Sequence, residues 1–80
     1  MSDEVIDEAI LSALREIPRH WRKVAMVVSK VATAMSDGLA PGDAEYETVA
    51  RRMESLVRKG RLLAQGDIKN WRLSEVRLPS

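Results

Sequence analysis

The chain has 80 residues, with 13 lysines and arginines against 12 aspartates and glutamates, and a net charge of +1 at pH 7. A chain of this length forms one domain with a modest core and is too short for a second. It has no cysteine, which excludes a disulfide framework and a cysteine-bearing zinc site. The nearly neutral charge favours no particular class of partner.

The beginning of the chain is acidic, with Asp3, Glu4, Asp7 and Glu8, whereas a secretory signal peptide begins with basic residues. The longest uninterrupted apolar run is Val24–Val28, far below the roughly 20 residues that span a bilayer. We therefore expect a cytoplasmic protein without a membrane segment.

Charge alternates along the chain. Residues 1–17 have a balance of −4, residues 18–35 of +4, residues 36–47 of −4 and residues 48–61 of +4. Basic second and third helices beside an acidic first helix suit a DNA-binding protein whose first helix lies away from the phosphates. The same alternation neutralises charge between neighbouring helices of a small domain, so both interpretations stay open.

Apolar residues at helical spacing predict a first helix over Asp3–Glu16. We expect Ser2 or Asp3 to cap its N-terminus. Pro18 ends the pattern, because the residue before a proline disfavours the helical conformation. The apolar face consists of Ile6, Ala9, Ile10, Ala13, Leu14 and Ile17.

A second helix is predicted over Trp21–Met35. Met26 and Val27 fall outside its tightest apolar stripe, so the helix is apolar over a wide arc. Such an arc indicates either the central element of the core or a contact with another molecule. The stripe itself consists of Trp21, Val24, Ala25, Val28, Val31, Ala32 and Met35.

Two glycines and a proline in residues 36–43 predict a loop, with Asp43 as the N-cap of a third helix. This helix is predicted over Tyr46–Lys59, and Gly60 ends it in a left-handed backbone conformation. Its apolar stripe consists of Tyr46, Val49, Ala50, Met53, Leu56 and Val57.

A β-hairpin follows the third helix. Residues 61–65 form its first strand, Gly66–Asn70 its turn and Trp71–Leu78 its second strand. Because a lone hairpin is unstable, helices must cover one of its faces. The sequence therefore predicts an α+β fold in one domain over residues 1–80, with three helices followed by a two-stranded hairpin.

The chain resembles winged helix-turn-helix domains through four segments: Trp21–Val24, Arg52–Leu62, Gly66–Asp67 and Glu75–Pro79. Its C-terminal run is more particularly similar to small winged-helix domains at the end of some uncharacterised bacterial proteins, a group with no function to transfer. The broader resemblance implies DNA binding, with the third helix in the major groove and the hairpin, or wing, on the backbone. Many winged helices bind proteins instead. The loop before the third helix exceeds the turn of about 3–4 residues in a tight helix-turn-helix.

The third helix carries polar residues opposite its apolar stripe, given a turn of about 100° per residue. Arginine can bind guanine through two hydrogen bonds, and threonine, serine and lysine can reach base edges or phosphates. The alternative is a self-paired surface, because Glu47 and Glu54 precede Arg51 and Arg58 by one helical turn. The candidate DNA-binding residues of this helix are Thr48, Arg51, Arg52, Ser55, Arg58 and Lys59.

The wing adds Lys69 and Arg72 as candidate contacts to the DNA backbone, with Lys69 and Asn70 at its expected tip. Trp71 and Trp21 can each stack on a base, or pack within the protein instead.

No enzyme activity is predicted. His20 is the only histidine and has no evident partner for nucleophile activation or metal binding. The acids at the start of the first helix suit the helix dipole, and the four glycines form no phosphate loop. We expect no catalytic residue, metal or cofactor.

The sequence predicts a DNA-binding winged-helix protein, such as a transcriptional regulator, which can act as a homodimer. The alternative is a protein-protein interaction or adaptor module in which the wide apolar arc of the second helix, with Met26 and Val27, meets a partner or a second copy. The two functions differ in whether the arginines of the third helix are available or tied to Glu47 and Glu54.

Overall fold

Three helices pack against a small antiparallel sheet in the computed structural model, which describes residues 2–16, 20–37, 40–67, 70 and 72–79. The predicted α+β class is confirmed, and the layout is compatible with a winged helix. In chain order the elements are α1 (Asp3–Arg15), β1 (Arg22–Lys23), α2 (Val24–Met35), α3 (Asp43–Arg58), β2 (Leu63–Gln65) and β3 (Glu75–Arg77).

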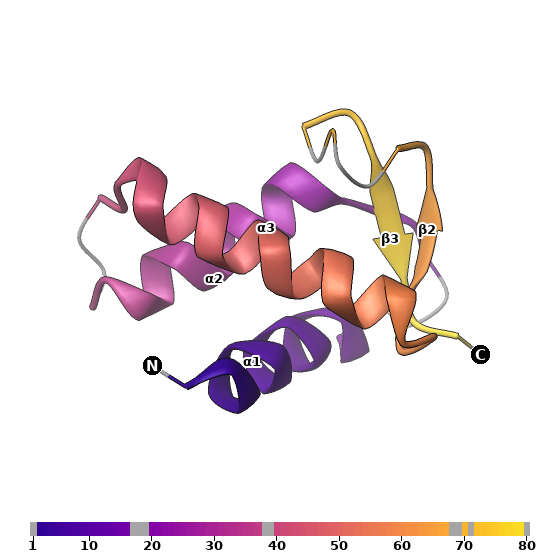
Figure 1. Cartoon of the computed structure of the whole chain (residues 1–80), viewed down its shortest axis with the longest axis horizontal. Helices are drawn as coiled ribbons and strands as arrows, with labels where there is room; N and C mark the ends of the chain where they lie inside the picture. Colours follow the sequence, from indigo (N-terminus) through magenta and orange to yellow (C-terminus); the bar gives the residue numbers. More distant parts are fainter. Residues whose placement is uncertain (1, 17–19, 38–39, 68–69, 71, 80) are drawn as a thin grey trace.

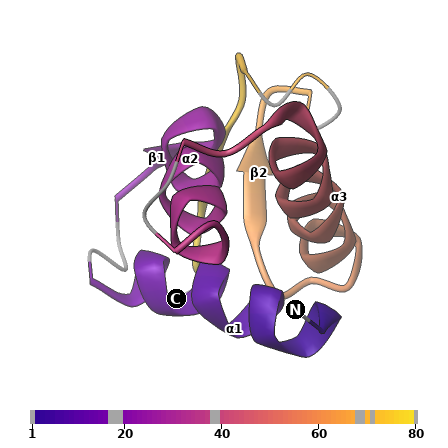
Figure 2. The same ribbon diagram turned by 90° about the vertical axis from the view of Figure 1, so that its left-hand side faces the viewer.

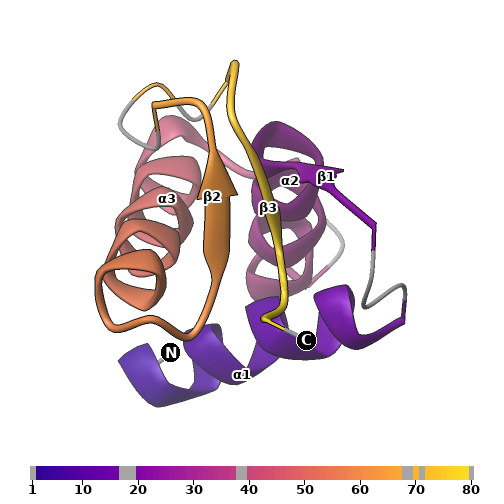
Figure 3. The same cartoon turned by 90° about the vertical axis from the view of Figure 1, so that its right-hand side faces the viewer.

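The helices and the sheet form a layered arrangement. Helices α2 and α3 stand beside each other above α1 (Figure 2). The strands lie across one side of this pair, and the loop between β2 and β3 is at the end of the molecule opposite α1 (Figures 1 and 3). This loop, residues 66–74, is called the wing below.

The sheet has three strands in the order β1-β3-β2: the predicted hairpin is present as β2 and β3, and β1 is an additional strand that the sequence does not predict. Arg22 lies opposite Val76 and Lys23 opposite Glu75. Because these residues form a strand, α2 begins at Val24 and not at Trp21. A two-residue strand whose partner lies near the other end of the chain leaves no local pattern in the sequence.

The hairpin is shorter than predicted. The strand expected over Trp71–Leu78 is limited to Glu75–Arg77, which pairs with Leu63–Gln65. Trp71 lies outside the described residues. Residues 72–74, expected in the second strand, therefore belong to the wing.

All three helices and the sheet contribute to the core. Apart from Ile17, which lies outside the described residues, the predicted apolar faces of the helices are largely buried, and Leu62 and Val76 add the contribution of the hairpin. The helical core residues are Ile6, Ile10, Leu11, Leu14, Val24, Val27, Val28, Val31, Ala32, Val49, Ala50, Met53 and Leu56.

The wide apolar arc of α2 separates into two parts. Val27 is only 4% exposed and belongs to the core, whereas Met26 is 53% exposed. Of the two alternatives for the wide arc, the core is therefore correct for Val27, which is not available for a dimer or partner contact. It lies in the core because the bundle covers α2 over a wider arc than one stripe.

The helix ends follow local capping chemistry. The Ser2 side chain accepts a hydrogen bond of 3.3 Å from the Val5 backbone, as predicted. The N-cap of α3 is Gly42 and not Asp43, because the Glu45 carboxylate accepts the Gly42 N–H at 3.0 Å and starts the helix earlier. The predicted start at Tyr46 was correspondingly late.

Gly60 ends α3 in the predicted left-handed conformation, with φ of 76°. The Arg61 N–H donates to the Leu56 carbonyl at 2.9 Å, and the Gly60 N–H donates to the Val57 carbonyl at 3.1 Å. These two bonds form a Schellman motif. It turns the chain so that Leu62 enters the core and β2 can begin.

Candidate nucleic-acid interface

The outward face of α3 is the side opposite its buried residues, and it consists of Glu47, Thr48, Arg51, Ser55 and Arg58. Arg51 lies near the middle of this face and is exposed. Thr48 and Ser55 are half-buried on one side of it. The structure therefore brings four of the predicted DNA-binding residues onto one surface.

Arg52 is the exception among the candidates of α3, because it turns toward α1. Its Nε and Nη2 atoms donate to the two carboxylate oxygens of Asp7, each at 2.8 Å, and its Nη1 lies 3.5 Å from Asp3. The side chains of Arg52 and Asp7 are about one-fifth exposed. Arg52 therefore joins two helices, and the interpretation of it as a DNA contact loses support.

The ion pair also shifts the acid-base equilibria of its members. The hydrogen bond from Arg52 lowers the pKa of Asp7 below its ordinary value, against the opposing effect of burial. Lys59 and Arg61, at the end of α3, lower the pKa further through their charge. The bond to Asp7 raises the pKa of Arg52. Both groups therefore stay ionised at neutral pH.

The two glutamate–arginine pairs predicted along α3 have different outcomes. Glu54 and Arg58 form an ion pair across one helical turn. Within the described residues, by contrast, no ion pair is found for Glu47 or Arg51. The outward face therefore combines a self-paired arginine at its C-terminal end with an available one, Arg51, near its middle.

The other candidates of α3 offer limited hydrogen-bonding capacity. The Thr48 hydroxyl donates to the Ala44 carbonyl of its own helix at 2.8 Å, so its oxygen is left as an acceptor. Lys59 is exposed at the C-terminal cap, near Asp7. Positive charge for a phosphate thus comes from Arg51, Arg58 and Lys59.

Two backbone hydrogen bonds join described residues of the wing. The Asn70 N–H donates to the Asp67 carbonyl, and the Leu73 N–H donates to the Asn70 carbonyl, each at 2.9 Å. Arg72 is exposed there, and Leu73 is 80% exposed. Lys69, the other candidate of the wing, lies outside the described residues.

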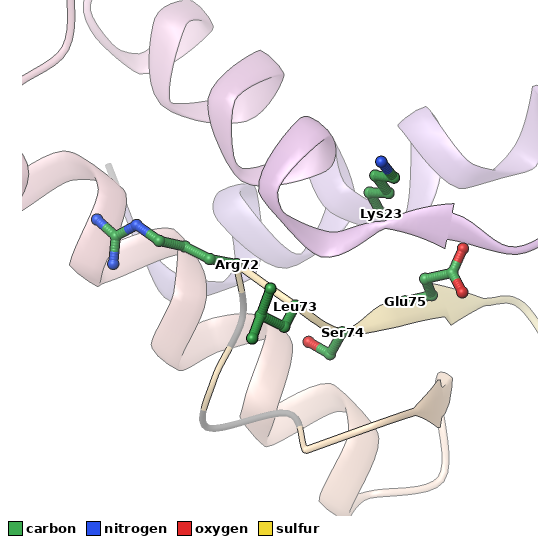
Figure 4. A pocket seen from close by; sticks show the side chains of 5 residues that line it. All are labelled: Lys23, Arg72, Leu73, Ser74 and Glu75. Atoms are coloured by element: carbon green, nitrogen blue, oxygen red, sulfur yellow. The ribbon is translucent and has the colours of Figure 1, made fainter.

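A hollow of about 300 Å³ lies between β1 and the wing, lined by Lys23 and residues 72–75. Lys23 and Glu75 extend to the same side of the strands, whereas Arg72 extends from the other end of the segment (Figure 4). The two cationic side chains do not converge, so the hollow has no concentrated positive charge for one anion.

Trp21 packs against the sheet. The guanidinium of Arg77 lies over its ring, 5.0 Å from the ring centroid, which is the geometry of a cation–π contact. Trp21 is half-buried and this contact occupies one face of the ring. The structure thus favours packing over base stacking for Trp21.

The sequence reasoning missed the partners of Arg52. Asp7 is one of the acids at the start of the first helix, for which the sequence indicates only an interaction with the helix dipole, and 45 positions separate it from Arg52. No local spacing relates the two residues. The available signal was the pairing of an acidic first helix with a basic third helix, which was considered only as general neutralisation.

Other kinds of site find no support in the described part of the chain. No three histidine, aspartate or glutamate side chains there converge as metal ligands. No helix among those residues has the length and apolar character required to cross a bilayer.

Comparison of the chain with protein-family models, with curated proteins and with solved structures finds no match. What the fold and the site define is therefore a small α+β domain of winged-helix-like layout, whose third helix presents a polar, arginine-bearing face.

Proposed function

We propose that this domain is a winged-helix module that binds double-stranded DNA through the outward face of α3. Arg51 is placed in the major groove, with Thr48 and Ser55 beside it, and the wing lies along the backbone with Arg72. A helix fits the major groove, where arginine can read guanine through two hydrogen bonds. Transcriptional regulation is the biological role that suits such a module.

The exposure of Arg51 is the observation that supports this proposal most. Arg52 is bound to Asp7 and Arg58 to Glu54, so these arginines must give up a partner to contact DNA fully. Arg51 has no such partner to give up, since no ion pair is found for it among the described residues. Its central place on the outward face also gives it the first contact with an approaching duplex.

Binding to a random-sequence duplex, followed by fluorescence anisotropy across a salt series, tests the proposal. Each phosphate contact should contribute a slope of roughly −0.9 to the plot of log affinity against log salt. We expect measurable binding at about 50 mM salt, where the electrostatic contribution is large. Absence of binding under that condition would contradict the proposal.

Arg51→Ala and Arg51→Lys distinguish the effect of the positive charge of Arg51 from the effect of its two-bond geometry. Loss of a phosphate contact should make the slope shallower by about 0.9 in the alanine variant. The lysine variant should retain most binding to random duplex, because it keeps the charge but not the two-bond geometry. Arg22→Ala is the matched control, since it removes one positive charge from β1, on the far side of the sheet from β2.

The wing supports a second candidate function, a protein-interaction module. Among the described residues, Leu73 is the most exposed of the large apolar side chains, and apolar side chains at a surface can mark a protein contact. Under this function Leu73→Ser weakens binding to the partner, whereas Arg51→Ala leaves it unchanged. A domain that fails to bind duplex DNA at low salt would favour this candidate.

A further inference from the structure

A shallow groove runs between α1 and α2, on a side of the molecule that the sheet does not cover. It encloses about 250 Å³, and its lining is mainly apolar. Helix α1 lies along one edge of the molecule, with α2 next to it (Figures 1 and 2). The residues that shape the groove are Ala9, Ser12, Ala13, Glu16, Lys30, Val31 and Ala34.

The groove continues into an exposed stripe on α1. Val5, Ala9, Ser12 and Glu16 follow one another at helical spacing. Val5 is 50% exposed although it is a large apolar residue. Ala9 and Ser12 are small, so the backbone of another helix can approach closely at the middle of the stripe.

The charges beside this stripe determine which helix fits. Glu8 and Arg15 lie on one side of Ser12 and form an ion pair of 2.6 Å, with side chains 62% and 55% exposed. At the C-terminal end of the groove, Lys30 and Glu16 form another exposed pair of 3.2 Å. The N-terminal half of α1 is acidic, with Glu4 and Glu8 exposed, whereas Arg15 and Lys30 lie at the other end.

A second copy of α1 in antiparallel orientation matches this pattern. When two such helices cross near Ser12, twofold symmetry places Glu8 of each copy beside Arg15 of the other. A parallel arrangement instead brings the acidic halves together and is repelled. The charge pattern is thus self-complementary in one orientation only.

We propose that the chain forms a twofold-symmetric dimer through α1 and the α1–α2 groove, with the two α1 helices antiparallel. This contact differs from the dimer through Met26 and Val27 expected from the sequence. It does not depend on DNA binding and leaves the outward face of α3 uncovered.

Sedimentation equilibrium over a wide concentration range provides the first test, with the unmodified chain expected to pass from monomer to dimer. Ser12→Arg brings two guanidinium groups together at the symmetry axis, and it should raise the dissociation constant at least about 10-fold. Ser29→Arg is the matched control, because Ser29 is exposed on α2 and does not line the groove. A monomer at every concentration, or equal dissociation constants for the two variants, overturns the proposal.

A charge-exchange experiment tests the orientation. Glu8→Arg makes both positions of the pair positive, and Arg15→Glu makes both negative, so each variant alone should be monomeric. Mixed in equal amounts, the two should form a heterodimer, because each positive side chain then lies beside a negative one. Circular dichroism of each variant verifies that the exposed substitutions leave the fold intact. Folded variants that stay monomeric when mixed, or that dimerise alone, contradict the antiparallel arrangement.

Discussion

Asp7 of α1 and Arg52 of α3 are joined by two parallel hydrogen bonds of 2.8 Å each. This two-bond geometry holds the guanidinium plane against the carboxylate and joins α3 to α1. In the same packing, Val49, Ala50, Met53 and Leu56 of α3 are buried in the core. Arg51 lies on the opposite side of the helix and is therefore exposed.

Asp7→Asn should lower the free energy of unfolding. It leaves Arg52 partly buried without its main anionic partner, and hydrogen bonds to charged groups contribute about 1.5–3 kcal/mol. Urea denaturation of the two proteins at pH 7 measures the difference. Glu8→Gln is a suitable control at protein concentrations below those at which the proposed dimer forms, because the Glu8–Arg15 pair is exposed and should contribute less than about 1 kcal/mol. Equal losses for the two variants would show that the Asp7–Arg52 pair adds nothing beyond a surface pair.

The same ion pair should make stability depend on pH in acid. Because the pKa of Asp7 is lower in the folded state, its contribution is complete above the ordinary aspartate pKa of about 3.9 and is lost as pH falls through the lowered value. The stability difference between the unmodified chain and Asp7→Asn should therefore be constant near neutrality and shrink below about pH 4. Denaturation series from pH 7 to about pH 2.5 measure this, and a constant difference throughout excludes the linkage.

Gly60→Val should destabilise the fold by at least about 1 kcal/mol, because left-handed backbone is costly for a residue with a Cβ atom. A Cβ atom at this position meets nothing within 4 Å, so the loss comes from backbone conformation and not from a clash. Gly60→Asn should cost less, since asparagine tolerates this conformation. The order of the thermal midpoints tests the prediction, which fails if valine and asparagine are equivalent.

Val27→Glu and Met26→Glu should behave differently although the residues are adjacent. Val27 is 4% exposed and Met26 is 53% exposed, so only the first substitution buries a carboxylate in the core. We expect a loss of about 3 kcal/mol or more for Val27→Glu. For Met26→Glu the change should stay within about 0.5 kcal/mol. Chemical denaturation measures both, and similar midpoints would contradict the assignment of Val27 to the core.

Glu54→Gln should strengthen binding to duplex DNA if the proposed function is correct. The substitution releases Arg58 from its ion pair and removes a negative charge that repels phosphate. One added phosphate contact should steepen the salt dependence by about 0.9. Glu16→Gln is the control, because it also removes a negative charge and releases a cation, Lys30, from an exposed ion pair, but at the α1–α2 groove. Unchanged affinity and slope in Glu54→Gln would indicate that Arg58 does not contact the duplex.

The sequence by itself was sufficient to predict the features that depend on residues close together in the chain. The apolar spacing of α1, the Ser2 cap and the left-handed turn at Gly60 each depend on a few consecutive residues, and the structure confirms them. The α+β class followed from the same local patterns. The interpretation of α3 as a helix with one polar face is also confirmed. The helix begins at Asp43, after the Gly42 cap, and not at Tyr46 as predicted.

Tertiary packing alone decided the features that join distant parts of the chain. The strand β1 exists because Arg22 and Lys23 pair with β3, and Val27 is buried because the bundle covers α2 widely. Arg52 belongs to an ion pair and not to the outward face because α1 crosses beside α3. Periodicity and turn chemistry carry information over one or two turns of chain, whereas strand pairing, burial and ion pairs between helices depend on which surfaces meet when the chain folds.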